Sequence, residues 1–147
     1  MFVVIVGGGN VGRHLAERLV KDKQSVVVVE KNPQVASLVA QETGARVITG
    51  DGDDPKVLEE ASTGAADVFV AVTGDDEDNL VACTLAKFQF GVGRVLARVN
   101  NSKNQWMFER DMGVDVSVSE ADVMARLLEE DITLDELVTL LKIREGN

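Results

Sequence analysis

The chain has 147 residues, the length of one domain or of one domain and the start of another. With 45% hydrophobic and 27% charged residues it has the composition of a globular protein, which excludes disordered, collagen-like and fibrous classes. Fifteen basic and 25 acidic side chains give a net charge of −10, which argues against a nucleic-acid partner. One cysteine, no apolar run near roughly 20 residues and no basic leader predict a soluble cytoplasmic protein without direct membrane insertion.

Short Val-rich runs bounded by Gly, Pro, Asp or Asn predict strands that are buried on both faces. We expect these strands over residues 2–6, 25–30, 46–49, 68–73, 95–99 and 114–118. The segments between them predict helices over 11–21, 33–42, 55–61, 79–90 and 103–112. Alternating strands and helices form βαβ units, so the expected fold is α/β, a Rossmann-type doubly wound parallel sheet.

The pattern changes after the sixth expected strand. A helix is expected from residue 119 or 120 to about 131, and a separate apolar segment covers 134–143. Both need a surface to pack on, whether the sheet, another subunit or a domain outside this chain. We therefore divide the chain into a Rossmann domain over 1–118 and a C-terminal helical extension over 119–147.

The strongest motif is the turn after the first strand, which has a G-x-G-x-x-G pattern at Gly7, Gly9 and Gly12. In such a motif the first glycine permits the tight turn, the second admits a pyrophosphate and the third allows close helix packing. Glu30 ends the second strand, where a carboxylate binds ribose hydroxyls and repels a 2′-phosphate. A dinucleotide without that phosphate is the expected ligand.

Two acidic loops leave the third and fourth strands at the carboxyl edge of the sheet. In the first loop, Asp51 is positioned either to meet an adenine or to belong to a turn before a helix capped by Asp54. In the second, Thr73 and Gly74 are candidates to line the nucleotide, and the acids over 75–78 favour helix capping over cation binding. We predict no metal site.

Arg98 is a charge inside the otherwise apolar fifth strand, near its carboxyl end. Such a residue needs an acid or a phosphate as its partner. A structural ion pair and a ligand contact remain equal alternatives on these grounds.

These motifs together resemble the nucleotide-binding domain of the Trk/Ktr potassium-uptake regulatory subunits and the RCK domains of potassium channels. The similar stretches are IVGGGNVG, VVVVEKNP, VITGDGDDPKVLEEA, ADVFVAVTGDDEDN and LARVNN, which cover most of residues 1–118 in the family's order. The resemblance implies that the loop holds the phosphates and Glu30 the ribose. The implied site consists of Gly7, Gly8, Gly9, Asn10, Val11, Gly12, Glu30, Lys31, Asp51, Gly52, Thr73, Gly74 and Arg98.

The resemblance also implies a non-enzymatic ligand sensor that forms dimers or rings on the cytoplasmic face of a membrane-embedded potassium transporter or channel. Family members exchange a helix after the sixth strand across a two-fold axis, and residues 137–147 resemble the opening of the family's small C-terminal subdomain. Some members carry an arginine where this chain has Asn10 and use it on a terminal phosphate. NAD(H) is therefore the favoured ligand, with ADP, AMP and ATP as alternatives.

An NAD-dependent oxidoreductase fragment is the competing hypothesis. It requires a substrate domain and a proton donor, and the chain is taken up by the Rossmann unit. No HExxH, GxSxG or Walker A lysine motif occurs in the sequence. We therefore expect a regulatory module and no catalytic residues.

Overall fold

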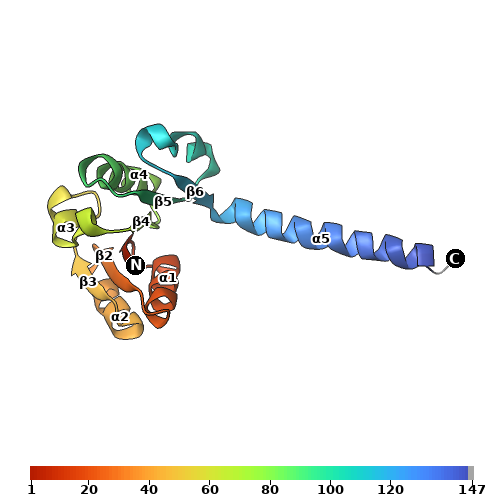
Figure 1. Ribbon diagram of the computed structural model, residues 1–147, viewed down its shortest axis with the longest axis horizontal. Helices are drawn as coiled ribbons and strands as arrows, with labels where there is room; N and C mark the ends of the chain where they lie inside the picture. The colour runs from red at the N-terminus through yellow and green to blue at the C-terminus, as the bar shows by residue number, and fades with distance from the viewer. Residues whose placement is uncertain (146–147) are drawn as a thin grey trace.

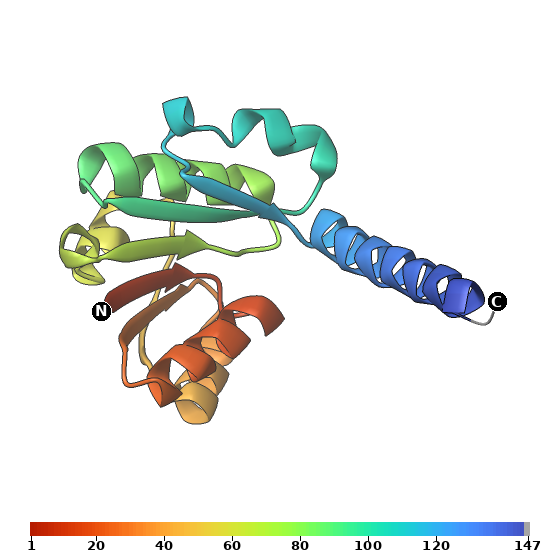
Figure 2. The same ribbon diagram turned by 45° about the vertical axis from the view of Figure 1, so that its right-hand side comes forward.

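The computed structural model describes residues 1–145, a sheet with helices on both faces and a long helix that projects from it (Figures 1 and 2). The strands are β1 (Phe2–Val6), β2 (Ser25–Glu30), β3 (Arg46–Thr49), β4 (Val68–Ala71), β5 (Arg94–Val99) and β6 (Val116–Ser119). The α-helices are α1 (Asn10–Lys21), α2 (Pro33–Thr43), α3 (Pro55–Glu60), α4 (Asp76–Thr84) and α5 (Glu120–Glu145). All neighbouring strands are parallel in the order β3-β2-β1-β4-β5-β6, which confirms the predicted fold class.

Two apolar layers hold the helices to the sheet. Alternate residues of each central strand belong to opposite layers, as the pleat requires. On one face, Val3 and Ile5 of β1 pack with Ala16 of α1. On the other, Val4 of β1 lies in the layer that contains Leu58 of α3. Because both faces of β1 are covered, its Val-rich run is buried throughout.

The helix starts follow local signals in the sequence. Asn32 caps α2 by accepting hydrogen bonds from the backbone N–H groups of Gln34 (2.9 Å) and Val35 (3.2 Å), and Pro33 opens that helix. Asp54 caps α3 in the same way, through the Lys56 N–H at 2.9 Å. The predicted turn with an Asp54 cap is therefore confirmed.

Several predicted boundaries were wrong. The helix expected over 79–90 begins three residues earlier, at Asp76, because Asp75 caps it by accepting from the Asp78 N–H at 2.9 Å. It then continues as a π-helical turn, η2 (Leu85–Gln89). The strand expected over 68–73 ends at Ala71, and the last strand is 116–119 instead of 114–118. In place of the helix expected over 103–112 are two 3₁₀ turns, η3 (Ser102–Met107) and η4 (Arg110–Met112), between which Phe108 enters the core.

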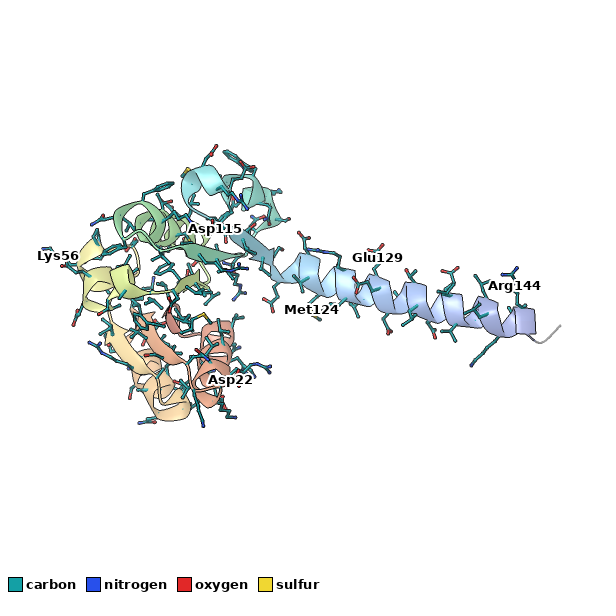
Figure 3. The ribbon with its side chains drawn as sticks, in the orientation of Figure 1. Asp22, Lys56, Asp115, Met124, Glu129 and Arg144 are labelled. Carbon is teal, nitrogen blue, oxygen red and sulfur yellow. The ribbon has the colours of Figure 1, made fainter. Side chains whose placement is uncertain are left out.

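The C-terminal extension is one helix, not the two short elements that were expected. No glycine or proline interrupts α5 over its 26 residues, and the β-branched pair Ile132-Thr133 costs a helix only tenths of a kcal/mol. Figure 3 shows its side chains extending outward all around, and every residue from Met124 to Arg144 is exposed. Residues 146–147 of the predicted extension lie outside the described residues. Between residues 1 and 145, no helix combines the length and apolar character needed to cross a membrane.

One part of the sheet has no helix on it. On the face that α1 and α2 cover elsewhere, an apolar groove runs over β4, β5 and β6 to the start of α5. It is lined by Val11, Val70, Val72, Leu96, Ala97, Arg98, Val118, Glu120, Val123 and Met124. Below we call it the sheet groove.

Asp76 fastens the first turn of α4 to the loop that follows β5. Its carboxylate accepts hydrogen bonds from the backbone N–H groups of Asn100 (2.6 Å) and Asn101 (2.9 Å) and from the side-chain amides of Asn100 (3.0 Å) and Asn104 (2.9 Å). Partial burial would raise the pKa of Asp76, but these hydrogen bonds together hold that pKa below its usual value.

We therefore expect Asp76→Asn to lower the free energy of unfolding at pH 7 by about 1–3 kcal/mol, because hydrogen bonds to a carboxylate are lost. Folding lowers the pKa of this carboxyl. Its ionised form therefore stabilises the protein at pH values above the pKa of the unfolded state, near 4, and this stabilisation is lost as the pH falls through the pKa of the folded state. The difference in free energy of unfolding between Asp76→Asn and wild type should thus become smaller as the pH falls from 5 to 2. Urea denaturation across this range measures it, with exposed Asp111→Asn as the control; an equal difference at both ends would contradict the assignment.

Candidate functional site

The glycine loop joins β1 to α1 through close backbone packing. Gly7 adopts a φ of +110° that L side chains rarely adopt, and its N–H donates to the Val29 carbonyl at 2.9 Å. A Cβ on Gly12 would collide with the carbonyl oxygen of Gly7. These two positions therefore require glycine for the fold itself.

Gly9 is different, because nothing in the protein requires it to be small. It is the N-cap of α1, and a Cβ built on it meets no atom within 4 Å. The space beside Gly9 faces the first free N–H groups of α1, which is where a helix N-terminus binds an anion. The structure therefore leaves open space beside Gly9 at the N-terminus of α1.

Glu30 at the end of β2 is held in place by backbone donors. Its Oε1 accepts from the Gly8 N–H and its Oε2 from the Asn32 N–H, both at 2.8 Å. A carboxylate has about four lone-pair positions, so two remain for other donors. The same side chain thus orders the glycine loop and offers acceptors for ribose hydroxyls.

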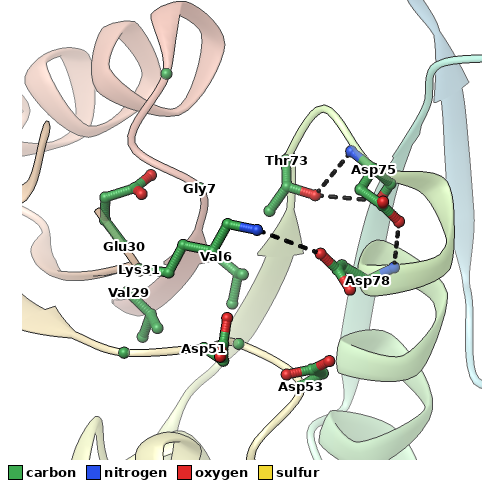
Figure 4. A pocket seen from close by; sticks show the side chains of 13 residues that line it. Val6, Gly7, Val29, Glu30, Lys31, Asp51, Asp53, Thr73, Asp75 and Asp78 are labelled. Atoms are coloured by element: carbon green, nitrogen blue, oxygen red, sulfur yellow. Dashed lines mark hydrogen bonds and ion pairs between the residues drawn. The ribbon is translucent and has the colours of Figure 1, made fainter.

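A pocket lies at the carboxyl edge of the sheet, beside the point where the strand order reverses between β1 and β4 (Figure 4). It is lined by Val6, Gly7, Gly9, Val29, Glu30, Lys31, Gly50, Asp51, Gly52, Asp53, Thr73, Asp75 and Asp78. A Cβ on Gly52 would run into the Val6 side chain, so this loop lies directly on the end of β1. Ligands of open α/β sheets bind at such an edge.

The pocket is strongly acidic. Five carboxylates line it, and Lys31 is the one cation among its lining residues. In Figure 4, Lys31 reaches across the pocket toward Asp78, with Nζ 4.0 Å from Oδ2. Burial, and then the charges of Asp75 and Asp53, raise the pKa of Asp78. This charge disfavours anionic groups inside the pocket and favours neutral hydrogen-bond donors.

Asn79 connects the ends of β4 and β5 from within the protein. It is fully buried, and its Oδ1 accepts from the N–H (2.9 Å) and the hydroxyl (2.6 Å) of Thr73. Its Nδ2 donates to the carbonyls of Thr73 and Arg98, both at 3.0 Å. The Thr73 N–H binds this side chain and not a neighbouring strand, which explains why β4 ends before Thr73.

Arg98 has an ion-pair partner at the start of α5. Its Nη2 lies 2.9 Å from Oε2 of Glu120, and its buried Nε has no partner among the described residues. The side chain lines the sheet groove together with Val11 and does not line the acidic pocket. The ion-pair alternative is therefore present in this structure.

The structure brings together about half of the predicted site residues in the pocket, namely Gly7, Gly9, Glu30, Lys31, Asp51, Gly52 and Thr73. Gly8 contributes its N–H to Glu30, and exposed Gly74 lies beside Thr73. Asn10, Val11 and Gly12 belong to the first turn of α1. The Asn10 Oδ1 accepts from the Arg13 guanidinium at 2.9 Å, and Arg13 also lies 3.5 Å from Glu42.

Sequence reasoning missed part of the lining. Asp53, Asp75 and Asp78 lie in loops whose acidic residues were interpreted as helix caps. Asp75 does cap α4, and it also lines the pocket. Val6 and Val29 also line it, at strand ends next to the motifs. The signal that could have indicated them is that both acidic loops follow strands whose carboxyl ends lie at the same edge of the sheet. Within residues 1–145, no group of three or more His, Cys, Asp or Glu residues is placed to hold a metal ion.

Comparisons with known proteins agree on the relationship. The TrkA-N domain family matches residues 3–120. The Trk system potassium uptake protein TrkA of Mycobacterium tuberculosis is 40% identical over 147 residues, which cover 99% of this chain and 66% of the relative. A TrkA homolog of Methanothermobacter thermautotrophicus is 39% identical over 147 residues, covering 100% and 67%. The chain thus spans about two thirds of the length of these relatives.

Solved structures share the fold at low sequence identity. The TrkA-N domain of the Escherichia coli inner membrane protein ybaL has a TM-score of 0.78 at 19% identity, covering 88% of this chain and 94% of that one. The C-terminal domain of Shewanella denitrificans Kef in its AMP-bound form gives 0.72 at 22%, covering 91% and 81%. The GsuK channel bound to NAD gives 0.69 at 24%, covering 80% and 21%.

The family match covers all six strands, and the identity to the curated relatives extends along the whole chain. The glycine loop leads from β1 into α1, and Glu30 is the last residue of β2. This chain belongs to the TrkA-N domain family.

Proposed function

We propose that this chain is the nucleotide-binding part of a regulatory subunit that controls a membrane-embedded potassium transporter or channel. Its place is the cytoplasmic face of the membrane, where it is held by that partner. The observation that carries the proposal is the glycine loop with free space at Gly9 beside an ordered Glu30 carboxylate. The relatives named as Trk potassium uptake proteins supply the transport context.

The favoured ligand is NAD(H), with ADP, AMP and ATP as alternatives. The adenosine half fits the acidic pocket, where Glu30 meets the ribose and Asp51 and Gly52 lie near the base. The pyrophosphate fits over Gly9 and the N-terminus of α1. NAD and AMP in two structural neighbours support this class of ligand. The first turn of α1 carries Asn10 in place of an arginine, and Arg13 is occupied by Asn10 and Glu42, which disfavours a third phosphate.

The first test is binding measured by calorimetry with NAD, NADH, ATP, ADP and AMP. Gly9→Val should abolish binding while the protein stays folded, because its side chain enters only the space assigned to the pyrophosphate. Glu30→Ala should weaken binding by about 1.5–3 kcal/mol, because charge-assisted hydrogen bonds to the ribose are lost.

Gly12→Val is the contrasting variant, since it should lose stability by colliding with Gly7. If both Gly9→Val and Glu30→Ala bind every nucleotide as wild type does, the site is wrong. The same preparations, incubated with NADH and common carbonyl substrates, examine the alternative of an oxidoreductase. Turnover of NADH there would overturn the regulatory proposal in favour of that enzyme.

We further propose that residues 119–147 form a dimerisation extension and the start of a C-terminal subdomain. Along α5, exposed aliphatic residues recur every three or four positions, for example Leu134, Val138 and Leu141. The sheet groove is an uncovered apolar surface on the same chain. A second copy is the occupant that satisfies both surfaces at once, with α5 of each chain packed against the other.

Light scattering at micromolar concentration should therefore give at least a dimer mass, because burying these aliphatic side chains stabilises association by about 25 cal/mol per Å². Deleting residues 120–147 should reduce that mass. Leu134→Lys should weaken the dimer, whereas Glu129→Lys on the same exposed helix provides a control of charge alone. A full-length chain that stays monomeric would contradict the proposed dimer.

For Arg98 we propose a ligand contact in addition to its ion pair with Glu120. Its guanidinium shares the sheet groove with Val11, the second residue of α1, next to the loop that holds the phosphates. Its Nε has no partner among the described residues, so the side chain has donors to spare.

If Arg98 contacts a phosphate, Arg98→Ala should weaken nucleotide binding more than it lowers the melting temperature of the ligand-free protein. Glu120→Gln should leave binding unchanged or tighter, because a competing carboxylate is removed. Calorimetry and thermal unfolding on both variants measure this. If Arg98→Ala has a lower melting temperature than wild type but the same dissociation constant for the nucleotide, Arg98 has a structural role alone.

A further inference from the structure

We propose that Asn79 is a positioning residue for the nucleotide site, one that ties the carboxyl end of β4 to that of β5 and so sets the position of Thr73 in the pocket wall. The inference rests on the proposed function, because it concerns binding at that same site. Asn79 is fully buried and does not itself line the acidic pocket, so it acts through its neighbours.

The hydrogen bonds of Asn79 leave one orientation of its amide. The Thr73 N–H is a donor, and the Thr73 and Arg98 carbonyls are acceptors, so Oδ1 must face the first and Nδ2 the other two. Both protons of Nδ2 and two lone pairs of Oδ1 are then used. A buried side-chain amide that is fully satisfied in this way fixes its partners in position.

The consequence for the site comes from what each partner does. Thr73 lines the pocket, and a Cβ on Gly7 of the glycine loop would lie 3.0 Å from the Thr73 nitrogen. A shift of Thr73 therefore changes both the pocket wall and the turn that precedes the phosphate site. On the next strand, Asn79 holds the Arg98 backbone, whose side chain projects to the opposite face of the sheet. One amide thus ties Thr73, which lines the pocket, to the end of the neighbouring strand β5.

Asn79→Asp is the sharpest variant because it keeps the size and the acceptors and removes both donors. At pH 8 its carboxylate would face the Thr73 and Arg98 carbonyls and should weaken binding of NAD⁺ by at least about tenfold. Burial raises the pKa of such a carboxyl, and the carboxylates of the N-cap Asp75 and of Asp76 and Asp78 in the first turn of α4 raise it further. The Arg98 guanidinium lies on the other face of the sheet, toward Glu120. A protonated Asp regains one donor, so lowering the pH to 5.5 should restore most of the affinity relative to wild type.

Cys83→Ala is the matched control. Cys83 is also fully buried, one turn farther along α4, and its thiol lies 3.6 Å from the Leu96 carbonyl of β5. This variant should lower the melting temperature and leave the affinity for NAD⁺ unchanged at both pH values. A loss of affinity in Asn79→Asp that Cys83→Ala does not share separates positioning from mere loss of stability.

The test is calorimetry with NAD⁺ at pH 5.5 and 8, with ADP at pH 8 as a second probe. It distinguishes failure of this inference from failure of the proposed function. If wild type binds none of NAD⁺, NADH, ATP, ADP and AMP, the proposed function falls and the inference with it. If wild type binds and folded Asn79→Asp binds equally at pH 8, the inference alone is overturned. If Asn79→Asp does not fold, hydrogen exchange on wild type decides the question. The Thr73 N–H should exchange as slowly as the N–H groups in the interior of β4, and it should exchange more slowly still when NAD⁺ is bound. If the Thr73 N–H exchanges as fast as the Gly74 N–H, and at the same rate with and without NAD⁺, the inference is overturned.

Discussion

The contact between Gly12 of α1 and the carbonyl of Gly7 determines how the rest of the site is built. Because no Cβ stands between them, α1 begins directly at the end of β1 and its free N–H groups face the sheet edge. The unusual φ of Gly7 makes the turn short, and Glu30 on the adjacent strand fixes the Gly8 N–H. A larger residue at Gly12 would collide with the Gly7 carbonyl and displace the N-terminus of α1.

Charge divides the site into two parts with different preferences. The pocket concentrates carboxylates from the ends of β2, β3 and β4 around one lysine, whereas the glycine loop offers backbone N–H groups. Such a division suits a ligand that presents neutral hydrogen-bond donors at one end and an anionic group at the other. In a chain with a net charge of −10, local backbone dipoles are a way to attract an anion without a basic patch.

Most of the fold and the core of the site could be predicted from the sequence, because local signals determine them. Val-rich runs gave the strands, and the glycine spacing followed by an acidic strand end gave Gly7, Gly9 and Glu30. The errors arise where tertiary contacts override local pattern. The Asn79 side chain binds Thr73 and ends β4, and burial of Phe108 leaves two 3₁₀ turns in place of the expected helix. The uninterrupted α5 was missed because an acidic residue, Asp131, breaks its apolar pattern.

Because α5 is long, a small rotation at its base displaces its far end by a large distance. At 1.5 Å per residue, its 26 residues extend about 39 Å from the sheet edge. Its attachment to the body is confined to its first residues, where Glu120 meets Arg98 and Val123 and Met124 reach the sheet groove. A tilt of about 10° at that attachment therefore moves the far end of a helix of this rise by about 7 Å. Displacements at β5 too small to alter the core are thus magnified several-fold at the tip of the helix.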